Sequence, residues 1–272
     1  MAYPGRIYAL SPPISPWYDR LTTLQKGYYY PWHSILPAWH GEDVFRSLLA
    51  LHLKVNLDVL EVACAQGELA LEMAALVRSV VAYDRAADYI RLAQEAAQER
   101  GIRNVTFLRH DSSSQANGGQ PHIPAPDASF DLLVCSKGPF HWIEDARRVA
   151  RPGATLLMLV PDATPLTPWT ALLPEALRWQ KPDDPNWARP AIEQRLATIQ
   201  LGLHSWWSFD VPEYFFTPHE LYCWRTWGAT SEEVPTYADV AADLEHIFRQ
   251  YAGFQGLEIR RHRYIWKAVS LG

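Results

Sequence analysis

The sequence predicts an α/β protein built on a doubly wound, mostly parallel seven-stranded sheet with helices on both faces. Two observations lead to this prediction. From residue 57 to residue 160, short runs rich in β-branched and apolar residues alternate with helical runs, which is the pattern of a parallel sheet covered by helices. Near the C-terminus two more strand-like runs are interrupted by helical insertions, and an N-terminal helical cap precedes the first strand.

The first two strands each lead into a helix. The run Leu-Asp-Val-Leu-Glu-Val-Ala at 57–63 predicts a strand, and the amphipathic stretch 68–77 predicts a helix. A second strand is expected over 79–83. The Ala-, Gln- and Glu-rich segment 87–100 predicts the next helix, which Gly101 terminates.

Three more strands complete the parallel part of the sheet. The third is expected over 104–108. The near-continuous apolar run 130–135 is typical of a strand buried on both faces. A turn at Pro152-Gly153 introduces the fifth strand, 154–160.

The regular alternation ends at residue 160. We expect a Pro- and Trp-rich insertion at 161–190, a helix at 191–201, a strand at 205–211, a helical insertion at 217–251, a last strand at 257–268 and, before the sheet, a helix at 41–52.

Size and composition limit the class of protein. Of the 272 residues, 48% are hydrophobic and 20% charged, which is enough to bury one large core or one core with a smaller lobe. The longest apolar run, 154–160, is far shorter than the roughly 20 residues of a membrane-spanning helix. Residues 1–10 lack the apolar stretch of a secretion signal, and the three cysteines form no CxxC pair. We therefore expect a soluble, cytoplasmic protein with no membrane partner.

The charge distribution bears on the binding partner. The formal net charge of −5 gives no overall attraction to phosphate backbones. Basic residues gather only in short groups, such as 147–151 and 260–263, as is usual for solvated surface. We expect a small-molecule substrate rather than a nucleic acid, and the sequence does not indicate the oligomeric state.

The loop after the first strand, Glu61 to Gly67, has three possible ligands: a dinucleotide, a phosphate or a cationic cofactor. A dinucleotide fingerprint uses three glycines and a P-loop adds a lysine, but only Gly67 is present here and no lysine follows it. A negative Glu61 would oppose a phosphate held at the helix N-terminus. The loop favours a cationic ligand such as S-adenosylmethionine, which carries a sulfonium and an ammonium group.

Acidic residues also follow the next two strands. Asp84 ends the second strand, where a carboxylate can accept both ribose hydroxyls. Asp111 and Ser112 follow the third strand, where they can face an adenine edge. Three acids in register after successive strands indicate a nucleoside site.

In these residues the segment 57–160 resembles the class I, Rossmann-like, S-adenosylmethionine-dependent methyltransferases. The matching motifs are the loop from Glu61 to Gly67, Asp84, the pair Asp111 and Ser112, the fourth-strand run 130–134 and the basic-x-Pro-Gly turn at 148–153. The resemblance implies S-adenosylmethionine as cofactor, S-adenosylhomocysteine as product and in-line methyl transfer. The cofactor-binding residues that it implies are Glu61, Ala63, Gly67, Asp84, Arg85, Asp111, Ser112 and Ser136.

One departure from the family pattern lies in the first loop. Ala63 and Ala65 stand where the family usually has glycine. If these positions need a positive φ, each alanine costs roughly 1 kcal/mol or more. The departure puts cofactor affinity in question.

The candidate catalytic residue is His141, just past the fourth strand. Methyl transfer from a sulfonium needs little beyond alignment of the nucleophile, but a hydroxyl or ammonium acceptor must lose a proton, and histidine suits that task. The alternative is a histidine that is hydrogen-bonded within its loop. Both readings remain open.

The resemblance also suggests how the chain is organised. We expect an aromatic-rich N-terminal cap at 1–52, a cofactor-binding Rossmann-like core at 53–160, and a substrate-side part at 161–272 with insertions at 161–190 and 217–253. Aromatic residues crowd into 3–39 and 169–227, where they could fill a core or form the walls and lid of a pocket.

No metal site is expected. The segment His219-Glu220-Leu221-Tyr222-Cys223 begins like a zinc-protease helix, but a cysteine replaces the second histidine. With Pro218 before it, the segment is more typical of a helix start.

The sequence therefore predicts an S-adenosylmethionine-dependent methyltransferase for a small-molecule acceptor. One alternative is a non-catalytic, cofactor-binding relative that acts as an interaction or regulatory protein. The other is an RNA methyltransferase.

Overall fold

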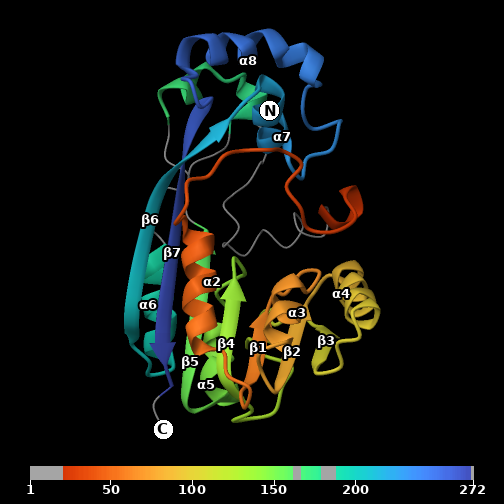
Figure 1. The fold of residues 1–272 in the computed structure, drawn as a ribbon, viewed down its shortest axis with the longest axis vertical. Coiled ribbons are helices and arrows are strands. Elements are labelled where there is room, and N and C mark those ends of the chain that lie inside the picture. The colour runs from red at the N-terminus through yellow and green to blue at the C-terminus, as the bar shows by residue number, and fades with distance from the viewer. Residues whose placement is uncertain (1–20, 162–166, 179–187, 271–272) are drawn as a thin grey trace.

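One seven-stranded sheet forms the centre of the protein in the computed structural model, which describes residues 21–161, 167–178 and 188–270 (Figure 1). The strand order is β3-β2-β1-β4-β5-β7-β6. The strands are β1 (Asp58–Val62), β2 (Ser79–Asp84), β3 (Val105–Arg109), β4 (Phe130–Ser136), β5 (Ala150–Pro161), β6 (Leu203–Phe215) and β7 (Leu257–Val269). The first five strands pair in parallel, and β7 is antiparallel to both β5 and β6. The predicted α/β fold is confirmed.

Helices cover both faces of the sheet. They are α2 (Gly41–His52), α3 (Glu68–Ala74), α4 (Ala87–Glu99), α5 (Ile143–Val149), α6 (Ala188–Thr198), α7 (Pro218–Thr226) and α8 (Tyr237–Tyr251). On one face Ile90 of α4 packs in a core with Val59 of β1. On the other face Ile143 of α5 and Ile192 of α6 pack in a core with Leu133 of β4. The central strands are apolar because both of their faces are buried.

A cap lies beyond the carboxyl end of β5. Pro161, the last residue of β5, pairs with Arg263, whereas the earlier residues of β7 pair with β6 as far as Leu257 opposite Phe215. The antiparallel pair of β6 and β7 therefore extends past the parallel strands. Helices α7 and α8, which connect the two strands, lie at the far end of this pair (Figure 1). The core of the cap includes the buried aromatic residues Trp32, Trp169, Phe215, Trp224 and Trp227. Much of the aromatic content of the two Trp-rich segments is thus core packing.

Three elements differ from the sequence prediction. Strand β6 is longer than the expected 205–211, because its second half pairs with β7 in the cap. Strand β5 begins at Ala150, so that the Pro152-Gly153 turn lies inside it. Helix α5 is absent from the prediction, since it has only seven residues and no capping side chain at its start.

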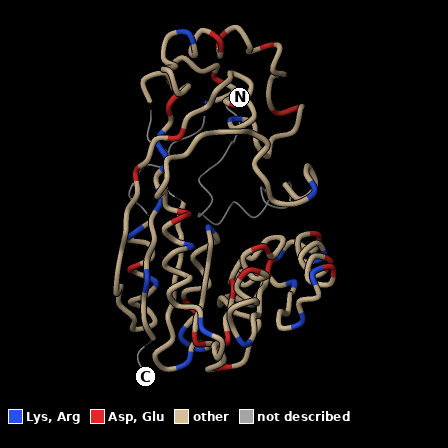
Figure 2. The backbone as a smooth tube through the Cα atoms, viewed as in Figure 1, with Lys and Arg blue, Asp and Glu red and all other residues tan. Residues whose placement is uncertain are grey.

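Other sequence predictions are only partly tested. Residues 1–20 of the predicted N-terminal cap, and residues 162–166 and 179–187 of the predicted Pro-rich insertion, lie outside the described residues. The domain boundaries at 52 and 160 stay predictions. No helix in the described segments is long and apolar enough to cross a membrane. Acidic and basic residues are interspersed over core and cap (Figure 2).

Candidate active site

The predicted site residues gather at the carboxyl edge of the parallel strands. Glu61 lies next to the last residue of β1, and Asp84 and Ser136 end β2 and β4. Strand order reverses between β1 and β4, and such a switch point is where open α/β sheets bind ligands. The loops after these two strands therefore bound the candidate site, and the cap lies on the same side.

The β1 loop is held in a strained conformation. Ala63, Ala65 and Gly67 have φ angles of 54°, 46° and 79°. Only Gly67 is glycine, and a Cβ atom there would lie 2.6 Å from the ring of Phe107. Both alanines therefore adopt the positive φ that the sequence analysis considered, and each costs about 1 kcal/mol of stability relative to glycine.

Asp84 fixes this loop. Its Oδ2 atom accepts a hydrogen bond from the Ala65 amide at 3.0 Å, and its Oδ1 atom accepts one from the Ala86 amide at 2.9 Å. Burial raises the pKa of Asp84, although these backbone hydrogen bonds and Arg85 oppose the shift. Each carboxylate oxygen keeps a second lone pair for a ligand hydroxyl.

Glu61 is a buried carboxyl group with an unsatisfied oxygen. The residue is 3% exposed, and its Oε2 atom has no hydrogen-bond partner among the described residues. Burial, with the nearby negative charges of Asp84 and Glu72, raises the pKa of Glu61 to about 8 against a hydrogen bond from the Ala70 amide. Glu61 is therefore neutral at pH 7 in the protein alone, and the sequence argument that assumed a charged Glu61 needs this correction. An arriving cation would favour its ionised form.

The β4 loop packs directly against the β1 loop. At Gly138 a Cβ atom would lie 2.6 Å from Cys135 Sγ and 2.9 Å from Ala63 Cβ. Lys137, the residue before it, has a φ of 63°. Ser136 is half-buried, and its backbone pairs with Leu159 of β5.

The structure brings Ser112 and His141 together. Ser112 Oγ lies 3.0 Å from His141 Nε2 and accepts a hydrogen bond from the Tyr83 hydroxyl at 3.1 Å. Burial, with the positive charges of Arg195 and Arg85, lowers the pKa of His141 to about 4 against the opposing effect of Asp111. His141 is therefore neutral at pH 7 and a weak base. These properties favour the alternative of a hydrogen-bonded histidine over that of a general base.

Asp111 and Arg85 lie beside that pair. Arg85 Nη1 is 3.8 Å from Asp111 Oδ2, and Asp111 Oδ1 accepts a hydrogen bond from the Ser113 amide at 2.9 Å. Burial would raise the pKa of Asp111, but Ser113, Arg85 and His141 together lower it. Asp111 is an ionised hydrogen-bond acceptor at neutral pH.

The N-terminal segment contacts the site through Tyr28 and Tyr30, which by sequence could either close over the cofactor or pack in a core. The Tyr28 amide donates to Gln66 Oε1 in the β1 loop at 2.7 Å, and Lys137 Nζ donates to the Tyr30 hydroxyl at 3.1 Å. The Tyr28 ring also meets Tyr89 of α4 edge-on at 6.4 Å. The crowding of aromatic residues in this segment was the available signal. Gln66 lies in the first motif loop without an assigned role, and no motif marks Lys137.

The zinc-like segment forms a helix start, as predicted. Thr217 and Glu220 form a reciprocal cap at the beginning of α7. His219 and Cys223 lie close on this helix, with Sγ and Nδ1 3.6 Å apart. In the described part of the chain, no three His, Cys, Asp or Glu side chains could together hold a metal ion.

Comparison with known proteins agrees with this geometry. Residues 59–157 match the family model of a methyltransferase domain. The uncharacterized methyltransferase YcgJ of Bacillus subtilis is 27% identical over 117 residues, 43% of this chain and 43% of that protein. The 2-heptyl-1-hydroxyquinolin-4(1H)-one methyltransferase of Mycobacteroides abscessus is 32% identical over 124 residues, 42% of this chain and 51% of that protein. A functionally unknown protein from Deinococcus radiodurans has a similar crystal structure, with a TM-score of 0.64 and 21% identity over 93% of this chain and 99% of that one.

The sequence matches cover only part of the chain, and the structural match shows only the fold. The chain spans about half the length of the curated relatives that it matches, 43% and 51%. The likeness to the Deinococcus structure shows the fold alone. The fold and the family match together indicate an α/β domain of the methyltransferase type. The match over 59–157 supports a methyltransferase domain of the class I type, and S-adenosylmethionine is the cofactor of that class.

Proposed function

We propose that this protein binds S-adenosylmethionine at the carboxyl edge between β1 and β4 and transfers its methyl group to a small-molecule acceptor. The observation that carries the proposal is Glu61, whose buried Oε2 atom lacks a partner among the described residues. A buried carboxyl in that state is costly unless a donor or cation reaches it. The ammonium group of S-adenosylmethionine would supply both.

The other site residues fit the remaining parts of the cofactor. Asp84 would accept the ribose hydroxyls while it holds the β1 loop, and Asp111, Ser112 and Arg85 would face the adenine. The bottom of the cofactor site would be formed by Gly67, Ala63 and Ser136. Van der Waals contact at Gly67 and Gly138 leaves these loops little room to shift.

The chemistry asks little more of the protein than alignment. The bound cofactor supplies a methyl group on a positively charged sulfur, which is a good leaving group. The residues of the chain hold the acceptor in line with that carbon and exclude water. His141, our sequence-based candidate for the base, is hydrogen-bonded to Ser112 and is a weak base, so we assign it a positioning role.

A small-molecule acceptor is supported by two observations. The net charge of −5 does not favour a nucleic acid, and the Mycobacteroides relative is named for a small aromatic substrate. The whole protein's acceptor is part of the proposal.

Calorimetry tests the proposal against the non-catalytic alternative. We expect S-adenosylmethionine to bind with micromolar affinity, and Asp84→Ala to abolish binding because it removes the ribose acceptor and frees the β1 loop. Asp88→Ala is the matched control, since that carboxylate is 67% exposed on the neighbouring helix. Absence of binding by the wild-type protein at millimolar cofactor would favour an interaction protein. Salt-sensitive RNA binding would favour the RNA methyltransferase.

A further inference from the structure

The pair of Tyr30 and Lys137 lies at the edge of the site and outside the cofactor residues. Lys137 Nζ donates to the Tyr30 hydroxyl at 3.1 Å, and the ammonium lies 5.4 Å from the centre of the same ring. Lys137 directly follows Ser136, the last residue of β4, and the next residue, Gly138, touches the β1 loop at Ala63. Lys137 therefore belongs to the loop after β4, one of the two loops that bound the candidate cofactor site.

The backbone at Lys137 is strained in a way that suits a functional role. Its φ of 63° is unusual for a residue other than glycine. The Lys137 amide donates to the Leu159 carbonyl at 2.8 Å, which anchors the turn. Such strain is typical of residues whose side chains must point in one direction.

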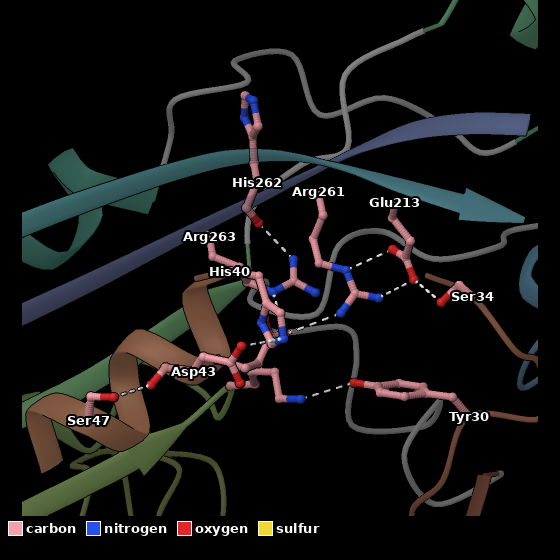
Figure 3. A network of polar contacts seen from close by, with 11 residues as sticks. Tyr30, Ser34, His40, Asp43, Ser47, Glu213, Arg261, His262 and Arg263 are labelled. Atoms are coloured by element: carbon pink, nitrogen blue, oxygen red, sulfur yellow. Dashed lines mark hydrogen bonds and ion pairs between the residues drawn. The ribbon is translucent and has the colours of Figure 1, made fainter. Parts of the chain in front are cut away.

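An ionic network, with buried groups at its centre, lies on one side of the pair (Figure 3). Arg261 of β7 makes two hydrogen bonds to Glu213 of β6, at 2.7 and 2.6 Å. Glu42 of α2 receives hydrogen bonds from Arg263 at 3.0 Å and from Arg261 at 3.3 Å. With Lys137, these groups carry three positive and two negative charges, and Asp43, which pairs with His40 beside Glu42, adds a third negative charge. The positive group in direct contact with the Tyr30 oxygen is the Lys137 ammonium.

Aromatic rings form the other wall around Tyr30. Its ring centre lies 4.9 Å from Trp32, 5.0 Å from Trp227 of the cap and 5.9 Å from Tyr28. The two tryptophans are buried, whereas Tyr28 and Tyr30 are half-buried and keep some accessible surface. The ring is thus packed between aromatic side chains, and the phenol oxygen is held by the hydrogen bond from Lys137.

These charges act on the phenol. Burial alone would raise the pKa of Tyr30, but Lys137, Arg263 and Arg261 outweigh it and lower that pKa to about 8. With this pKa roughly a tenth of Tyr30 is phenolate at pH 7 and about half at pH 8. A base whose pKa lies near the working pH is well suited to proton transfer.

We propose that Tyr30 and Lys137 form the acceptor end of the active site, where Lys137 binds the oxygen of a hydroxyl acceptor and Tyr30 takes its proton. This inference rests on the proposed methyltransferase function. In the reaction, the acceptor oxygen forms a bond to the methyl carbon, and the electrons of the carbon–sulfur bond stay on sulfur. The hydroxyl proton passes to the Tyr30 oxygen. The product is a methyl ether.

The Lys137 ammonium selects against an amine acceptor. An ammonium ion entering beside Tyr30 would be repelled by Lys137, whereas a developing oxyanion would be stabilised by it. We therefore assign the substrate class as acidic hydroxyl compounds, such as phenols.

Spectrophotometric titration tests the pair without any enzymatic turnover. The near-ultraviolet absorbance of tyrosinate should show a tyrosine that ionises near pH 8 in the wild-type protein, and Tyr30→Phe should remove this transition. Tyr29→Phe, which changes an adjacent tyrosine that is 50% exposed, should retain it. Lys137→Met should move it toward the ordinary value of about 10. A transition that survives in Tyr30→Phe would overturn the proposal.

Two probes of matched shape test the substrate class. 4-Nitrophenol should bind saturably as its phenolate, and Lys137→Met should weaken that binding at least about tenfold, as expected for loss of a charge-assisted hydrogen bond. 4-Nitrobenzylamine should bind more weakly than 4-nitrophenol. Equal or absent binding of both probes, or tighter binding of the amine, would contradict the proposal. Calorimetry with S-adenosylmethionine separates this inference from the proposed function on which it rests. Tyr30→Phe should bind the cofactor as the wild type does. Failure of the wild-type protein to bind it would contradict the proposed function instead.

Discussion

At the scale of single residues, the β1 loop combines strain with burial. Ala63 and Ala65 adopt left-handed backbone conformations that glycine would adopt without cost, and Asp84 holds the loop in this shape through the Ala65 amide. Strained loops of this kind persist only when surrounding contacts determine them. The fold therefore tolerates alanine in place of glycine at positions 63 and 65, but the free energy of unfolding is lower than it would be with glycine.

Replacing one alanine should recover that cost. We expect Ala65→Gly to raise the free energy of unfolding by about 1 kcal/mol, because the left-handed conformation is no longer strained. Denaturant unfolding measures the change. Ala96→Gly within helix α4 is the control and should lower the stability by about 1 kcal/mol. Equal losses in both variants would show that the loop strain is absent.

At the scale of elements, the site depends on the contact between two loops. The loop after β4 approaches the loop after β1 closely enough that only glycine fits at position 138. The parallel pairing of β1 with β4 fixes this approach, because both strands end at the same edge. A change in the β4 loop should therefore reach the cofactor site through Ala63.

We expect Gly138→Ala to weaken the binding of S-adenosylmethionine by about tenfold or more. The added Cβ atom would lie 2.6 Å from Cys135 Sγ and 2.9 Å from Ala63 Cβ, so the loops must separate. Calorimetry measures the affinity. Gly202→Ala, where nothing lies within 4 Å of the new atom, should bind as the wild type does. Unchanged affinity in Gly138→Ala would argue against a cofactor seated on these loops.

At the scale of the whole molecule, buried ion pairs join the cap to the core. Arg261 of β7 links Glu213 of β6 with Glu42 of α2, and Glu213 also accepts a hydrogen bond from Ser34 of the N-terminal segment at 2.6 Å. Glu213 is 1% exposed and the Arg261 side chain 11% exposed, so both are shielded from solvent. The network positions the N-terminal segment, and hence Tyr30, over the edge of the sheet.

Breaking this network should destabilise the protein strongly. We expect Arg261→Met to lower the free energy of unfolding by about 3–5 kcal/mol, because it leaves Glu213 buried without its cation. Arg260→Met on the same strand is the control, since its ion pair with Asp210 is far more exposed and should contribute only about 0–1 kcal/mol. Similar small losses in both variants would show that the network does not hold the cap.

Local patterns predicted the parts of the fold that local chemistry determines. Asp84 and Asp111 could be placed at strand ends because each follows a short run with strand-like composition, and the order of the strands brings them to one edge. The seven-residue helix α5 escaped prediction because its stability comes from tertiary packing of residues such as Ile143.

The rest of the candidate site depends on long-range contacts. Tyr30 and Lys137 are more than a hundred positions apart, and neither belongs to a motif. The protonation of Glu61 likewise follows from burial, which only the folded chain determines. The chemistry of the strand ends was therefore predictable, whereas the charge states and the acceptor end were not.

The central claim is that Glu61 becomes ionised when the cationic cofactor binds, and proton release tests it most directly. With a pKa of about 8 the free carboxyl is protonated at pH 7, and a bound cation lowers that pKa. Calorimetric titration of S-adenosylmethionine in buffers of different ionisation enthalpy should show release of close to one proton at pH 7. The affinity should rise up to about tenfold between pH 6 and 7, below the range where the cofactor's own amino group titrates. Glu61→Gln should bind more weakly, with no such release or pH dependence. Tight binding by the wild type without proton release, and unchanged affinity in Glu61→Gln, would contradict the account.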